Sequence, residues 1–222
     1  MIKSGIRIRI GFLPPLACVA LTFLWMAVMT NGFNLIDVMD GLAGGVGSVS
    51  AAALGTIFLL QGKQIGMVVC LSLIGALLGF LRYNRAPAQI YLGDTGSLLL
   101  GFLLGGLAIE ADYTLWNPFG WLTAVAVFAV PLFEIVFVSY LRLRRGASIF
   151  IGSRDHFSLR LRKWRFTTGQ TVFYSCAAAG LSSGVGIAAM HFPPLASLVG
   201  YGMVAAMFLV AAVWLKAIDM SL

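Results

Sequence analysis

Polar side chains recur at a fixed spacing in the stretch NGFNLIDVMDGLAGG, residues 31–45, which lies between two apolar runs. Every third residue is an amide or a carboxylate: Asn31, Asn34, Asp37 and Asp40. Residues three apart are neighbours on a helix surface, so the four side chains form a contiguous row. Such groups at a membrane helix end face a polar cavity in preference to lipid. The row therefore predicts a polar site at a helix end, and the alternative is that the two acids are solvated loop residues.

A second stretch, RYNRAPAQIYLGDTGSLLLG at residues 82–101, combines a glycine-containing turn with the start of an apolar run. Thr95 or Ser97 is expected to cap a helix that begins there. The free N–H groups of a helix start favour a phosphate, and Asp94 is a hard oxygen ligand suited to Mg²⁺ that also takes phosphate oxygens. The alternative is that Asp94 is only a cap. The turn is not a P-loop, because G-x-x-x-x-G-K-[ST] does not occur in the chain.

The third stretch, LRLRRGASIFIGSRDHFSLRLRKWRF at residues 141–166, holds eight basic residues and one acid. Guanidinium groups grip a diphosphate through two hydrogen bonds at once. The alternative is a cationic loop that fixes orientation and contacts anionic headgroups. Asp155 and His156 are its least expected residues and are taken as candidate site residues. Glu134, inside the preceding apolar run, is either a functional acid or a structural polar contact.

The elements that carry these stretches are predicted to be membrane-spanning helices. Of the 222 residues, 60% are hydrophobic and 10% are charged, against about 25% charged residues in soluble domains. This composition excludes a soluble α/β fold and predicts an all-α polytopic transmembrane bundle, with one domain over residues 1–222. Three cysteines in apolar runs are expected to be core residues without metal or disulfide chemistry. Seven spans are predicted, at about 11–30, 43–60, 64–81, 97–111, 118–140, 168–190 and 195–216.

Basic residues are distributed unequally between the two sides of this bundle. Eleven Lys and Arg residues follow the odd-numbered spans and four lie on the opposite side. The positive-inside rule then places the N-terminus outside and the C-terminus in the cytoplasm. The net charge of +7 is therefore attributed to membrane orientation, and no nucleic-acid partner is expected. The N-terminal basic cluster does not follow the rule, because the rule places it outside; it consists of Lys3, Arg7 and Arg9. All three polar stretches share the cytoplasmic side, in loops at about 31–43, 82–97 and 141–168.

Taken together, NGFNLIDVMDGLAGG, NRAPAQIYLGDTGSLLLG and SIFIGSRDHFSLRLR resemble, in order and spacing, the motifs of the polyprenyl-phosphate N-acetylhexosamine-1-phosphate transferases. That family includes bacterial phospho-MurNAc-pentapeptide translocase and the GlcNAc-1-phosphate transferases that begin O-antigen, common-antigen and teichoic-acid synthesis. The resemblance runs from Met1 to about Leu215 and corresponds to the family's C-terminal two thirds. It implies transfer of an N-acetylhexosamine 1-phosphate, GlcNAc-1-phosphate first among them, from a UDP-sugar to undecaprenyl or another polyprenyl phosphate. UMP is released, and the site faces the cytoplasm from the bacterial inner membrane.

The resemblance also implies a role for each matching residue. Asp94 corresponds to the family's metal-binding aspartate, with Mg²⁺ as the ion and Mn²⁺ as its substitute. Asp37, Asp40 and His156 are implied to be catalytic. The implied substrate-binding residues lie in all three stretches: Asn31, Asn34, Asn84, Tyr91, Arg154, Asp155 and Arg160.

Three departures from the family pattern are visible. Ser158 and Leu159 stand where further histidines are usual, and Val38 stands where a glycine usually follows the aspartate. The chain also has no adjacent pair of acids, which the family carries near an earlier span. The expected partner is therefore a missing N-terminal segment or a second copy in a homodimer. The alternative is a non-catalytic fragment or subunit. A transporter is a weaker alternative, because its polar residues should lie near the membrane midplane.

Overall fold

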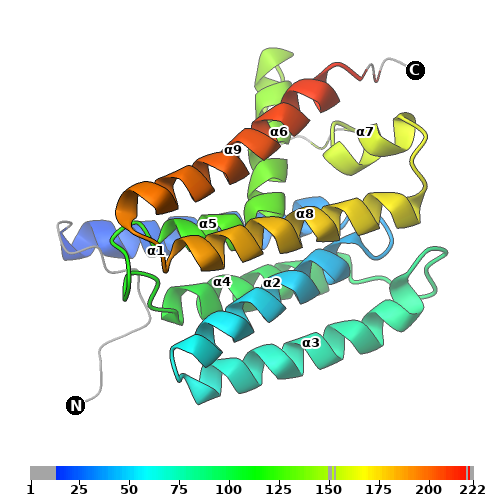
Figure 1. The fold of residues 1–222 in the computed structure, drawn as a ribbon. Coiled ribbons are helices and arrows are strands. Elements are labelled where there is room, and N and C mark those ends of the chain that lie inside the picture. The colour runs from blue at the N-terminus through cyan, green and yellow to red at the C-terminus, as the bar shows by residue number, and fades with distance from the viewer. Residues whose placement is uncertain (1–13, 150–151, 153, 219, 221–222) are drawn as a thin grey trace.

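Helices make up the regular secondary structure of residues 14–149, 152, 154–218 and 220, which are the residues that the computed structural model describes (Figure 1). Five of these helices are long and apolar enough to cross a membrane: α1, α2, α3, α8 and α9. The predicted all-α polytopic membrane fold is therefore confirmed. The helices are α1 Pro15–Ile36, α2 Leu42–Leu60, α3 Gln64–Asn84, α4 Gly93–Glu110, α5 Leu122–Val127, α6 Ala129–Arg144, α7 Phe157–Lys163, α8 Thr168–Ala189 and α9 Pro194–Lys216.

The span predicted over 118–140 is wrong as a single helix. The structure has two helices there, α5 and α6, which meet at Phe128, where φ is −103° and ψ is 23°. Pro131 has no N–H and cannot bond the carbonyl of Val127 four residues earlier. The buried Ser50 hydroxyl of α2 donates to that carbonyl instead, at 3.2 Å. Figure 1 shows the result, since α5 runs alongside α8 whereas α6 turns away and crosses behind α9.

Small residues allow α1 and α4 to pack closely. A side chain at Gly101 would collide with the Met29 carbonyl of α1. One turn later, the Trp25 indole donates to the Gly105 carbonyl at 3.1 Å. Close approach at glycines is the usual basis of helix association in membranes. The contact holds the C-terminal end of α1 beside the N-terminal end of α4, and these are the ends that carry the first two polar stretches.

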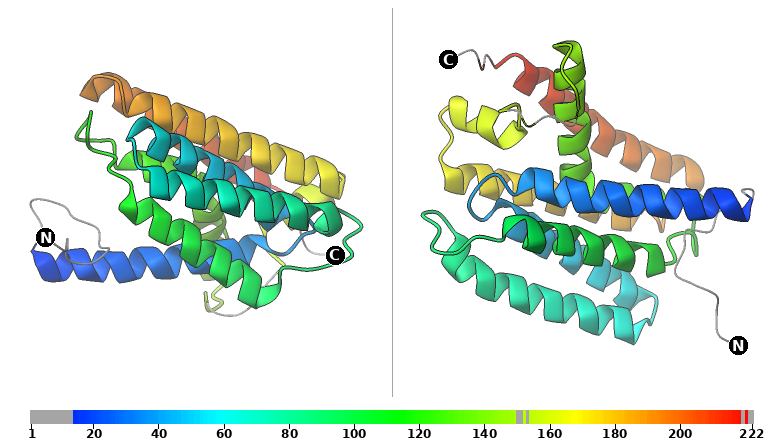
Figure 2. Two further views of the ribbon diagram at one scale, coloured as in Figure 1. Left: turned by 90° about the horizontal axis from the view of Figure 1, so that it is seen from below. Right: turned by 180° about the vertical axis from the view of Figure 1, so that it is seen from behind.

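One end of the bundle collects the connections that follow α1 and α3, together with α7, as all three views show (Figures 1 and 2). The three polar stretches therefore share an end, as their order in the chain requires. The opposite end is held by Lys63, which pairs with Asp112 at 2.9 Å and Glu110 at 3.9 Å. The number of spans and the side that each end faces stay predictions. Lys3, Arg7 and Arg9 lie outside the described residues.

Candidate active site

The first two polar stretches meet through Asn34 on α1 and Asp94 on α4. The Asn34 amide donates to Asp94 Oδ1 and to the Ser97 hydroxyl, each at 3.0 Å. Ser97 is fully buried and its hydroxyl donates to the Gly93 carbonyl at 2.9 Å. These bonds orient an exposed carboxylate, Asp94, at the end of the bundle. Residues sixty positions apart thus form one polar cluster.

The expected cap of this helix is different in the structure. Helix α4 begins at Gly93, with Leu92 in the cap position and no side-chain cap, so the prediction of Thr95 or Ser97 as cap is wrong. Gly93 has φ +64°, a conformation that glycine adopts without strain. Asp94 therefore lies in the first helical turn, where the helix dipole favours negative charge. The sequence could not set this boundary, because the turn residues before it do not form a regular pattern.

Asp37 lies next to this cluster, directly after α1. Its pKa is raised from an ordinary 3.8 to about 6, chiefly by burial and secondly by the negative charge of Asp94. The backbone N–H of Asp37 bonds the Asn34 carbonyl at 3.1 Å, which fixes the position of the residue. Two acids that repel one another create a place where a cation or a proton is favoured.

Asp40 and Asn84 join the two loops behind this cluster. Asp40 Oδ2 accepts from the Ala88 N–H at 3.1 Å. Asn84, which is buried, accepts from the Gly41 N–H at 2.9 Å and donates to the Ile90 carbonyl at 2.8 Å. Both side chains therefore bind backbone groups of the protein. The catalytic role of Asp40 and the substrate contact of Asn84 stay predictions, and the observed bonds give both residues a role in holding the loops.

Three other predicted substrate ligands lie at the surface. The Asn31 amide donates to the Ala27 carbonyl within α1 at 2.7 Å. Tyr91 is 74% exposed just before α4. Arg154 is exposed in the connection before α7. All three are accessible to a ligand at this end of the bundle.

The third stretch is different, because its central residues are buried. His156 Nδ1 lies 2.6 Å from Glu134 Oε1. The second Glu134 oxygen accepts from the Phe157 N–H at 3.2 Å. Glu134 is fully buried on α6 and His156 is 7% exposed. Glu134 thus makes a polar contact inside the protein, as its structural alternative predicts.

Asp155 and Arg160 complete this buried network. Asp155 pairs with Arg160 and with Arg145, each at 2.8 Å. Arg160, 1% exposed, also donates to the carbonyls of Leu215 and Ile218, at 3.2 and 2.7 Å. Leu215 lies in the last turn of α9 and Ile218 lies two residues after the helix ends, so Arg160 binds the carbonyl end of this helix. Both residues were predicted to bind substrate. In the structure their ion pairs and hydrogen bonds connect α7 to the ends of α6 and α9.

The exposed cluster fits a divalent cation that shares a phosphate ligand. Within the described part of the chain, no group of three or more His, Cys, Asp or Glu side chains could hold a metal ion alone. Mg²⁺ in phosphate-transfer sites uses one or two carboxylates and takes its remaining ligands from water and phosphate. Asp94, oriented by Asn34 and repelling Asp37, has the chemistry of such a ligand.

Comparisons with known proteins identify the relatives of this chain. The family model for glycosyl transferase family 4 matches residues 5–112. The undecaprenyl-phosphate alpha-N-acetylglucosaminyl 1-phosphate transferase of Escherichia coli K12 is 33% identical over 176 residues, which are 77% of this chain and 47% of the relative. Its counterpart in Salmonella typhi is 34% identical over the same shares.

A probable undecaprenyl-phosphate N-acetylglucosaminyl 1-phosphate transferase of Bacillus subtilis is 35% identical over 141 residues, or 64% of this chain and 39% of the relative. The chain thus spans about half the length of the curated relatives it matches. The matched residues include Asn34, Asp37 and Asp94, which the structure brings together. This multi-pass membrane chain belongs to glycosyl transferase family 4.

Proposed function

We propose that this chain carries the cytoplasmic site that transfers N-acetylglucosamine 1-phosphate from UDP-GlcNAc to undecaprenyl phosphate. An oxygen of the lipid phosphate attacks the sugar-bearing phosphorus of the nucleotide. A new P–O–P bond forms, the bond to the second phosphate breaks, and UMP leaves. The observation that carries the proposal is the Asn34–Asp94 contact beside Asp37, which places an oriented carboxylate and an acid of raised pKa at one bundle end.

The raised pKa of Asp37 suits this residue to the role of a general base. A general base works best when its pKa lies near the operating pH. The raised pKa of Asp37 is nearer to neutral pH than that of an ordinary aspartate. Asp37 then takes the proton of the attacking phosphate, and Asn34 keeps Asp94 in place beside it.

Asp94 would hold Mg²⁺, which when bound neutralises charge on the diphosphate oxygens. The exposed Arg154 is available to the remaining phosphate charge. The start of α4 adds N–H groups that favour an anion. Transfer of this kind depends mainly on positioning and charge neutralisation, so few groups need to react.

The buried network favours a positioning role for His156 over contact with substrate. Its Nδ1 is engaged by Glu134, and its neighbour Asp155 is paired on both oxygens. The proposed role is to fix the connection that carries Arg154 against α6 and α9. In this role the network shapes the site without touching the reacting atoms.

Release of UMP tests the proposal. The purified chain in nanodiscs receives UDP-GlcNAc, undecaprenyl phosphate and Mg²⁺, alone and co-expressed with the N-terminal half of the Escherichia coli relative. We expect UMP release in the co-expressed form, lost on chelation of Mg²⁺. No release in either form, with the intact relative active in parallel, would reject the proposal.

A second candidate, a nucleotide-binding subunit, is favoured by one observation, the coverage of about half of each relative. Binding of UDP-GlcNAc without UMP release in either form identifies this candidate. A homodimer or an N-terminal partner supplies the remaining site residues in both cases. Crosslinking in the membrane distinguishes the two assemblies.

The proposed location is the bacterial inner membrane with the site in the cytoplasm. Leu115 is exposed in the connection between α4 and α5, and Lys163 is exposed at the end of α7. This connection and α7 lie at opposite ends of the bundle (Figure 1). Single cysteines at these positions, in a background without native cysteines, should be labelled from opposite sides of sealed vesicles. Labelling of both from one side would reject the topology.

A further inference from the structure

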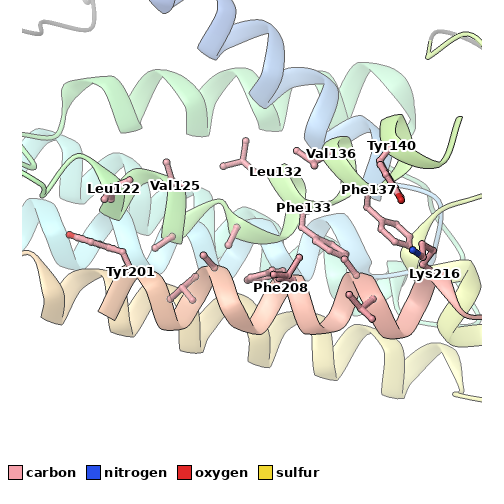
Figure 3. A pocket seen from close by; sticks show the side chains of 17 residues that line it. Leu122, Val125, Leu132, Phe133, Val136, Phe137, Tyr140, Tyr201, Phe208 and Lys216 are labelled. Carbon is pink, nitrogen blue, oxygen red and sulfur yellow. The ribbon is translucent and has the colours of Figure 1, made fainter. Parts of the chain in front are cut away.

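Helix α9 presents two different faces near its end. One face lines an apolar groove of about 680 Å³ between α9 and the pair α5 and α6, which meet at Phe128 (Figure 3). Trp214, in the last turn of α9, is 39% exposed and is not among the described residues that line this groove. Its ring contacts that of Trp164 at the end of α7, with the centroids 5.6 Å apart. The two indoles therefore join α9 to α7 on a surface outside the groove.

Helix α7 has a buried face and a charged, exposed face. Phe157 and Leu161 are buried on the side that packs against α6, α8 and α9. Arg162 and Lys163 are exposed, and so is Arg165 in the turn that leads to α8. Together with the two indoles, these side chains form a basic-aromatic surface: Arg162, Lys163, Trp164, Arg165 and Trp214.

The turn that carries this surface is held by three hydrogen bonds. The Arg165 N–H bonds the Arg162 carbonyl at 3.0 Å, and the Phe166 N–H bonds the Leu161 carbonyl at 3.1 Å. The Arg162 guanidinium donates to the Phe166 carbonyl at 3.1 Å. Arg165 itself has φ +74°, the left-handed conformation that reverses the chain direction. The basic side chains are therefore displayed by a fixed turn.

Little negative charge lies near this surface. Asp155 is the described acid closest to it in the sequence, but it is 2% exposed and pairs with Arg145 and Arg160. After Asp155 the chain has a single acid, Asp219, which lies outside the described residues. The basic-aromatic surface thus carries a positive charge that favours an anion from outside the chain.

The surface lies at the depth of the lipid headgroups. Helix α9 has 23 residues and is about 34 Å long at 1.5 Å per residue, against a hydrocarbon core of about 30 Å. Its last turn, with Trp214, therefore reaches the headgroup region. Helix α8 begins at Thr168, four residues after Trp164, and exposes Tyr174 near its start. Exposed Trp and Tyr side chains are typical of this interface.

We infer that the basic-aromatic surface binds the headgroups of anionic phospholipids. The basic side chains take the phosphate groups, and the two indoles pack beside the first carbons of the acyl chains. Such a lipid holds α7 against α8 and α9, and so it stabilises the buried network that α7 carries through Arg160. The inference goes beyond the proposed transfer of a sugar phosphate and does not depend on it.

The experiment uses the full chain in phosphatidylcholine nanodiscs that contain phosphatidylglycerol with a diazirine at the headgroup end of its acyl chains. Mass spectrometry locates the labelled residues. A triple variant removes the charge of the surface: Arg162→Gln, Lys163→Gln and Arg165→Gln. A matched control removes the same charge from exposed residues of α3, its following loop and α6: Arg82→Gln, Arg85→Gln and Arg144→Gln.

We expect labelling around Trp164 and Trp214 in the unchanged chain. One basic residue near an anionic membrane surface favours binding about fivefold, so the triple variant should lower labelling at least about tenfold. The control should keep it. Equal loss in both variants would overturn the inference, because it would show attraction by net charge alone.

Two further measurements complete the test. Unlabelled phosphatidylglycerol should compete with the probe, whereas phosphatidylcholine should not; stronger competition by undecaprenyl phosphate would identify a substrate site and overturn the inference. The unfolding midpoint of the unchanged chain should rise with the fraction of phosphatidylglycerol, and that of the triple variant should not. An equal rise in both proteins would also contradict the inference.

Discussion

Two polar regions at the same end of the bundle use their charges in different ways. In the region formed by α1 and α4, Asp94 is exposed, Asp37 is half-buried, and the two acids repel one another. In the region formed by α6, α7 and the end of α9, Asp155 and Arg160 are almost fully buried and paired. An exposed acid beside a like-charged neighbour favours a ligand that brings positive charge. The opposite charges of a buried ion pair neutralise one another and need no ligand.

The difference favours a chemical role for the first region and a supporting role for the second. The three polar stretches look equivalent in the sequence, as each combines charged residues with a membrane helix end. In the structure, the first two form an open polar cluster and the centre of the third forms a buried anchor. Substitutions in the two regions should therefore affect different measurements.

The largest expected effect is on stability, from Arg160→Ala. This change removes the buried Arg160 partner of Asp155 and the guanidinium that donates to the carbonyls of Leu215 and Ile218. Breaking a buried charge pair costs about 3–5 kcal/mol, so we expect a loss of that size in the free energy of unfolding. Unfolding in mixed detergent measures it. The control Arg162→Ala, at an exposed residue, should change stability by less than about 0.5 kcal/mol, and equal effects would contradict the anchor.

Next in size is the effect of Asp94→Asn on transfer. The amide keeps the shape but removes the charge that a hard cation requires. We expect UMP release to fall by at least about 100-fold in any form of the protein that is active. The unfolding midpoint should stay the same, because Asp94 is exposed. A rate equal to that of the unchanged protein would show that the open cluster does not act in the reaction.

Glu134→Gln should have an intermediate effect on stability and on transfer. It tests whether the buried network supports the reaction without binding substrate. It replaces the carboxyl partner of the His156 bond with an amide, and a buried polar group left without its partner costs about 1–3 kcal/mol. We expect lower stability and a lower kcat, with KM for UDP-GlcNAc unchanged. Glu134→Asp, which keeps the carboxyl group, should recover part of both. A rise in KM alone would place Glu134 in the substrate site.

The smallest expected effect is on the titration of Asp37. Its pKa in the folded protein, about 6, lies above 3.8, so the protonated form is favoured on folding. The stability that this group contributes is therefore present at low pH and is lost as pH rises from 3.8 through about 6. Asp94→Asn should lower this pKa without restoring it to 3.8, because burial is the larger cause. Infrared titration in Mg²⁺-free buffer measures the pKa of Asp37, and Asp37→Asn identifies its signal. A pKa that Asp94→Asn leaves unchanged would contradict the proximity of Asp37 to Asp94.

Local sequence predicted the open site better than it predicted the anchor. The spacing of Asn34 and Asp37 and the position of Asp94 after an odd span were enough to predict that these residues share one bundle end. Arg160 was expected to bind substrate, because seven other basic residues surround it in the stretch. Its partners include carbonyls of Leu215 and Ile218, more than fifty residues away. No local pattern signals such a contact.

The turn at Phe128 was missed for a similar reason. The apolar run continues through Pro131 without a polar interruption, so hydropathy predicts one span. The break depends on a lost backbone bond and on Ser50 of another helix. The apolar groove follows from that break, and it was therefore not predictable from the sequence.

Calorimetric titration of UDP-GlcNAc tests most directly whether the α1 and α4 cluster is the ligand site and the α6 and α7 network is its support. The experiment compares the unchanged chain, Asp94→Asn and Glu134→Gln, each with and without Mg²⁺. We predict binding that requires Mg²⁺, a Kd at least about 100-fold weaker for Asp94→Asn, and an unchanged Kd for folded Glu134→Gln. If Asp94→Asn still binds UDP-GlcNAc in an Mg²⁺-dependent way, the α1 and α4 cluster is not the ligand site. If folded Glu134→Gln loses this binding, the α6 and α7 network is more than a support.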